Sequence, residues 1–101
     1  MVSQSGLPGL PANYFDGLRE PLRGGVQRWL EAGIQPGSFL SSVIANDLKE
    51  SFRCADDSNL ASMREIVAWF YNKMPMPAWG SVANAEKWAA RYGRKFDWIG
   101  K

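Results

Sequence analysis

The chain has 101 residues, 46% of them hydrophobic, a net charge of +2, no histidine and one cysteine. This length suits one domain with its own core, the single Cys54 excludes an intramolecular disulfide, and no apolar run approaches the about 20 residues that cross a bilayer. The start of the chain lacks the basic and apolar stretches of a signal peptide. We therefore expect a cytoplasmic protein with a flexible lead-in over residues 1–11 and a single helical domain over residues 12–101.

The first predicted elements are a helical turn over residues 12–17 and a helix that follows it. Pro21 suits the first turn of a helix because its missing N–H has no partner there. Apolar residues then recur at helical spacing, and Gly33 supplies a natural end. The predicted inward residues of this helix are Leu22, Val26, Trp29 and Leu30.

A second helix is predicted from its cap residue Ser38 to Arg53. Its apolar stripe consists of Phe39, Leu40, Val43, Ile44, Leu48 and Phe52. The predicted solvent face carries Ser42, Asn46, Lys49 and Arg53. The uninterrupted stripe favours one continuous helix with both halves buried.

Two more helices follow. Residues 56–59 offer capping side chains, after which Leu60, Met63, Ile66, Val67, Phe70 and Tyr71 form a third stripe that ends at Pro75 and Pro77. Ser81 is the predicted cap of a last helix with Ala85, Trp88, Ala89 and Tyr92 inward and Gly93 at its end. The apolar tail, with Phe96, Trp98 and Ile99, is expected to pack back. Because no stretch alternates as a strand does, the predicted fold is all-α, a compact bundle of about four short helices.

The sequence contains no credible catalytic site. Without histidine it lacks the commonest general base and zinc ligand, and Cys54 is interpreted as a small packing residue. Four carboxylates, Asp47, Glu50, Asp56 and Asp57, offer oxygen ligands for a divalent cation. Capping and solvation explain them better, so a metal-dependent enzyme is the weaker hypothesis and no metal or cofactor is predicted.

The C-terminal part has the strongest binding signal. Residues 58–101 carry seven basic and three acidic side chains, interleaved with aromatic residues. Aromatic and arginine side chains are common anchors of protein interfaces. The predicted partner-binding residues are Trp79, Trp88, Arg91, Tyr92, Arg94, Lys95 and Trp98. The same residues also suit stacking and backbone contacts on nucleic acid, a homodimer, or simply a solvated basic face with its tryptophans in the core.

The middle of the chain resembles a group of small phage and prophage proteins of unknown function. The matching pattern is Gly33-Ile34-x-Pro36-Gly37-Ser38-Phe39-Leu40, Val43-x-x-Asn46-Asp47-Leu48-x-Glu50 and Tyr71-Asn72-x-x-Pro75-x-Pro77. This resemblance implies a viral or prophage origin, a role inside the bacterial host, and no catalytic residues. It suggests a non-catalytic protein that binds a host protein and modulates or inhibits it, as anti-CRISPR inhibitors of bacterial defence do; the alternative is a nucleic-acid-binding protein or small transcriptional regulator.

Overall fold

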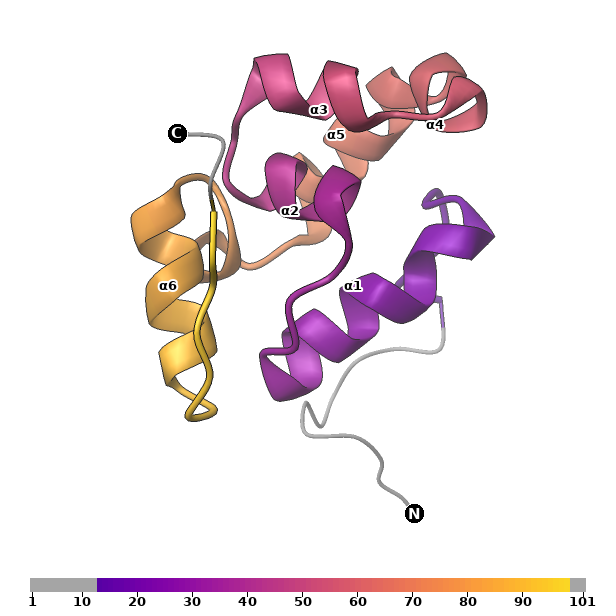
Figure 1. The fold of residues 1–101 in the computed structure, drawn as a ribbon. Helices are drawn as coiled ribbons and strands as arrows, with labels where there is room; N and C mark the ends of the chain where they lie inside the picture. The colour runs from indigo at the N-terminus through magenta and orange to yellow at the C-terminus, as the bar shows by residue number, and fades with distance from the viewer. Residues whose placement is uncertain (1–12, 99–101) are drawn as a thin grey trace.

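A computed structural model describes residues 13–98 of the chain, and the fold is all-α, as predicted (Figure 1). Within these residues the chain forms six α-helices and one 3-10 helix and no strand. The predicted bundle of about four helices is wrong in detail, because two of the predicted helices are each broken into two. The helices are α1 Glu20–Ala32, α2 Ser38–Ile44, α3 Leu48–Cys54, α4 Asp57–Ala61, α5 Met63–Lys73, η1 Met76–Ala78 and α6 Val82–Ala90.

Helix α1 follows the sequence prediction. Pro21 lies in its first turn, and Gly33 ends it in the left-handed conformation at φ 66°, which glycine adopts at little cost. Its buried residues are Leu22, Val26, Trp29 and Leu30. Before α1, residues 13–17 form turns, and Leu18 is buried.

The predicted helix from residue 38 to residue 53 breaks at Asn46. Asn46 has a positive φ of 59°, a conformation that asparagine tolerates better than most residues. The next residue, Asp47, then caps α3 by accepting a hydrogen bond from the backbone N–H of Glu50. The break rotates α3 away from the stripe of α2, so Leu48 is 70% exposed instead of buried.

The polar side of α2 was also predicted wrongly. Ser42, expected on the solvent face, is fully buried, and its hydroxyl donates to the carbonyl oxygen of Phe39. Ser41 is buried too and donates to the carbonyl oxygen of Pro36. Hydroxyls that bond to nearby backbone carbonyls can enter a core at little cost. The expected cap Ser38 is instead the first residue of α2, with Gly37 at the cap position.

The predicted third helix breaks at Ser62, between α4 and α5. Asp56 caps α4, as predicted from its residue type, by accepting a hydrogen bond from the backbone N–H of Asn59. Of the predicted stripe, Leu60, Val67 and Tyr71 are exposed. Trp69, which the stripe omitted, is buried.

Two tryptophans tie the core together across the chain. The Trp29 indole N–H donates to the carbonyl oxygen of Ala78 over 2.9 Å, and the Trp88 indole N–H donates to the carbonyl oxygen of Trp29 over 2.8 Å. A buried indole N–H needs such a partner. These bonds join α1, η1 and α6 into one packed unit.

The segment after α6 turns back and runs alongside that helix (Figure 1). Phe96 is buried against Trp29, which confirms that the tail packs back. The side-chain amide of Gln35 forms two hydrogen bonds with the backbone of Asp97: it donates to the carbonyl oxygen and accepts from the N–H. The predicted lead-in over residues 1–11 and the packing of Ile99 lie outside the described residues. In the described part, no helix is long and apolar enough to cross a membrane.

Candidate functional site

The structure separates the predicted partner-binding residues into different environments. Trp88 is 4% exposed and lies in the core, so it offers no contact surface in this fold. Trp79 lies between η1 and α6, where it packs against Phe70. The seven residues therefore do not form one continuous surface.

Tyr92 and Arg94 both bond to the backbone at the end of α1. The Tyr92 hydroxyl donates to the carbonyl oxygen of Leu30, and the Arg94 Nε–H donates to the carbonyl oxygen of Ala32. These acceptors lie in the last turn of α1, whose carbonyls have no partner in their own helix. Tyr92 and Arg94 thus cap α1, with the rest of the Arg94 guanidinium exposed.

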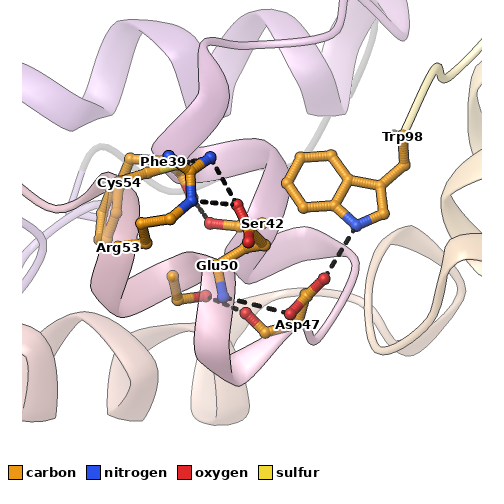
Figure 2. Close-up of polar contacts among 8 residues, drawn as sticks. Phe39, Ser42, Asp47, Glu50, Arg53, Cys54 and Trp98 are labelled. Carbon is orange, nitrogen blue, oxygen red and sulfur yellow. Dashed lines mark hydrogen bonds and ion pairs between the residues drawn. The ribbon is translucent and has the colours of Figure 1, made fainter. Parts of the chain in front are cut away.

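Trp98 is half-buried and is held by Asp47 (Figure 2). Its indole N–H donates to Oδ2 of Asp47 over 3.1 Å, while Oδ1 accepts the capping bond of α3. The contact joins the end of the chain to the break between α2 and α3.

Arg91 and Lys95 are exposed. The Arg91 guanidinium lies 4.5 Å from the centroid of the Trp88 ring, a cation–π contact. Arg91, Arg94 and Lys95 do not lie along one helix, because α6 ends at Ala90 and Gly93 has a φ of 71°. What remains is a small basic surface of Arg91, Arg94 and Lys95.

Of the four carboxylates considered as metal ligands, two cap helices and a third forms an ion pair. Asp47 and Asp56 are helix caps, and Glu50 pairs with Arg53 at 2.6 Å (Figure 2). This hydrogen-bonded carboxylate raises the pKa of the Arg53 guanidinium. Among residues 13–98, no group of three or more acidic or cysteine side chains is placed to hold a metal ion.

A different surface stands out on α3, α4 and α5. Five large apolar side chains on these helices are exposed: Leu48, Phe52, Leu60, Val67 and Tyr71. Phe52 follows Leu48 by one helical turn, and Tyr71 follows Val67 by one turn, so each pair continues along one side of its helix. We call these five residues the α3–α5 face. Leu48 and Val67 line one small pocket, and exposed apolar side chains that lie together in this way typically mark an interaction site.

A small socket opens within the α3–α5 face. It is lined by Val43, Asn46, Leu48, Ser51, Met63, Val67 and Trp79. The hydrogen bond from the Gly80 N–H to the carbonyl oxygen of Ile44, 2.8 Å long, holds Trp79 beside the turn that follows α2. The socket is therefore built where α2, α3, α5 and the loop before α6 meet, and its walls are mostly apolar.

Sequence reasoning missed this face because it assigned the same residues to the core. The signal for the break was present in Asn46-Asp47, an asparagine suited to positive φ followed by a capping aspartate. Cys54 is half-buried and lies within 3.6 Å of the Arg53 guanidinium.

No protein-family model matches the chain, and comparisons with curated proteins and with solved structures found no significant match.

Proposed function

We propose that this protein is a non-catalytic binding module that recognises another protein through the α3–α5 face. The observation that carries the proposal is the exposure of Leu48 and Tyr71, 70% and 79%, beside a preformed apolar socket. A rigid helical scaffold with exposed aromatic and aliphatic anchors is what a protein interface needs. Trp79 is the one residue of the predicted contact set that lines this socket.

The proposed partner is a protein of a bacterial host. The phage-like sequence pattern supports this choice. A small domain that covers part of a larger protein complex can block its assembly or its access to substrate. In this proposal the protein modulates or inhibits its target by occlusion, as an anti-CRISPR protein does, and performs no chemistry.

The test is capture from a nuclease-treated bacterial lysate with the tagged full chain. Three forms are compared: the natural protein, the double variant Leu48→Ser with Tyr71→Ser, and the control Met76→Ser. Met76 is apolar and 82% exposed but does not line the socket. We expect one host protein to be retained by the natural protein and the control and lost by the double variant. Equal retention by all three forms, or by none, would refute the proposal.

A second candidate function is nucleic-acid binding through the C-terminal basic surface. Arg91 and Lys95 are both exposed, and the half-buried Trp98 lies nearby in the chain, a combination that suits phosphate contacts. Its test is a gel shift of DNA and RNA across a salt series, with Arg91→Glu and Lys95→Glu as variants. Steep loss of binding with salt, abolished in the variants, would support it; no shift at low salt would end it.

A further inference from the structure

We propose that residues 94–98, which we call the C-terminal strap, form a releasable brace for α3. When the strap leaves its place, α3 loosens while the rest of the domain stays folded. This inference goes beyond the proposed function, because it concerns how the chain holds α3 whether or not a partner binds there. It follows from the way α3 is anchored, the way the strap is anchored, and the one side chain that joins them.

Helix α3 has little hold of its own on the core. Of its seven residues, Ser51 alone is buried, and Cys54 at its end is half-buried. The Ser51 hydroxyl and backbone N–H both donate to the carbonyl oxygen of Asp47, so its hydrogen bonds lead to the turn before the helix. Helix α5, by contrast, buries four large side chains, Met63, Ile66, Trp69 and Phe70. An element with few buried apolar contacts opens at a low free-energy cost.

The turn that anchors α3 is braced by the strap. Asp47 caps α3 by accepting the backbone N–H of Glu50 with Oδ1, and its Oδ2 accepts the indole N–H of Trp98 over 3.1 Å (Figure 2). Asn46, the residue before Asp47, has a positive φ of 59°, a conformation that costs any residue with a side chain some free energy. The bond to Trp98 therefore helps to fix a turn that the backbone alone does not favour.

The strap itself is docked by a small number of contacts. Residues 94–98 belong to no helix or strand, and Phe96 is the one buried residue among them, packed against Trp29. Arg94 donates to the last carbonyl oxygen of α1, and Gln35 bonds to the backbone of Asp97. With one buried side chain and a few hydrogen bonds, the strap opens more easily than the core does.

The strap can also leave without pulling the core apart. It starts directly after Gly93, which has a φ of 71°, and a Cβ placed on this glycine would meet no atom within 4 Å. Glycine in open space is a suitable pivot because it adopts many backbone conformations. The indole bonds of Trp29 and Trp88, which join α1, η1 and α6, involve no strap residue. The docked and undocked strap are thus two states of one folded domain.

The experiment is native-state hydrogen exchange of the full chain, followed by NMR at low denaturant concentrations, which gives an opening free energy for single amides. The Asp97 N–H, bonded to Gln35, reports on the strap. The Ser51 N–H reports on α3, and the Ile66 N–H reports on the core at α5. We expect the opening free energy to rise in the order Asp97, Ser51, Ile66, with Ile66 alone of the three exchanging through global unfolding.

Arg94→Ala tests whether the strap controls α3. The variant removes a strap contact that is made to α1 and not to α3. Exchange at Asp97 and Ser51 should speed up by the same factor, about fivefold for one hydrogen bond lost from the docked state. Arg91→Ala is the matched control, because Arg91 is an exposed arginine that precedes the strap. It should leave the exchange of both amides unchanged.

Asp47→Asn tests the same link from the side of α3. Asparagine is a good cap but has one acceptor oxygen in its side chain where aspartate has two. It can therefore not serve both the cap of α3 and the indole of Trp98 as Asp47 does. Exchange at Asp97 should speed up about fivefold in this variant, although the substitution lies 50 residues away in the chain. Circular dichroism verifies that each variant is folded.

Two results would overturn the inference. Exchange at Ser51 that Arg94→Ala leaves unchanged would show that α3 opens while the strap is docked. An opening free energy at Ser51 equal to that at Ile66 would show that α3 belongs to the cooperative core. Neither result bears on the proposed function, which is tested separately by the dependence of host-protein capture on Leu48 and Tyr71.

Discussion

The carboxylate of Asp47 holds two parts of the chain at once, because it caps α3 with Oδ1 and accepts the indole N–H of Trp98 with Oδ2. Residues 47 and 98 are thereby joined at the break between α2 and α3 (Figure 2). The break that exposes Leu48 is thus stabilised by Trp98, the last residue that the structure describes.

The first prediction concerns this carboxylate. Asp47→Ala should lower the free energy of unfolding by about 1–2 kcal/mol for the lost cap, with a further loss of about 1 kcal/mol for the unpaired indole. Trp98→Phe should keep the cap and lose the indole bond alone. Urea denaturation of the two single variants and the double variant measures their coupling. If the two effects are simply additive, the bond between Asp47 and Trp98 contributes nothing to stability.

The second prediction concerns Gly33 and Tyr92. A Cβ at Gly33 would lie 2.6 Å from Cδ2 of Tyr92, and the backbone there has a φ of +66°. Gly33→Ala should therefore destabilise the protein by more than the about 1–2 kcal/mol of left-handed strain. In the background of Tyr92→Ala the ring atoms are gone and only the Cβ of residue 92 remains, 3.1 Å away, so the same glycine substitution should cost less, close to the strain alone. Equal costs in both backgrounds, measured by thermal melting, would contradict the contact.

The third prediction compares two leucines that the sequence placed on one stripe. Leu40 is 7% exposed, whereas Leu48 is 70% exposed. Leu40→Ala should cost about 2–5 kcal/mol of stability, the range for a core leucine, and Leu48→Ala about 0.5 kcal/mol or less. Chemical denaturation distinguishes them. Similar large costs at both positions would mean that α2 and α3 form one buried helix after all.

The fourth prediction is a dependence on alkaline pH. Burial raises the pKa of the Tyr14 phenol above its usual value of 10.0, and its hydroxyl donates to the carbonyl oxygen of Lys73. The folded state holds this proton more tightly than the unfolded state, so stability falls as pH rises above about 10 and through the higher folded pKa.

Tyr14→Phe is the comparison that isolates this effect. The variant should lose about 1 kcal/mol at neutral pH with its hydrogen bond, and its stability relative to the natural protein should recover as pH rises through this window. Denaturation curves of both proteins between neutral and strongly alkaline pH measure the difference. A gap that stays constant across the window would show that Tyr14 keeps its ordinary pKa.

The sequence by itself determined the features that depend on neighbouring residues. Helical periodicity, Pro21, Gly33 and the capping residues Asp56 and Ser81 act within one or two turns, so α1, the end of α5 and the start of α6 were predictable. Tertiary structure decided where the two long stripes break. A continuous stripe is compatible with one helix or with two short ones, and the choice depends on which arrangement packs the core better.

The candidate site depended entirely on that choice. In a straight helix Leu48 and Phe52 would be buried, but Asn46 takes a left-handed turn and Asp47 gains a cap and a bond to Trp98. Trp88, which the sequence predicted as a contact residue, is buried in the core, where its indole N–H donates to the carbonyl oxygen of Trp29. Side-chain types alone determine which residues are apolar; only the packing of distant segments decides which of them meet the solvent.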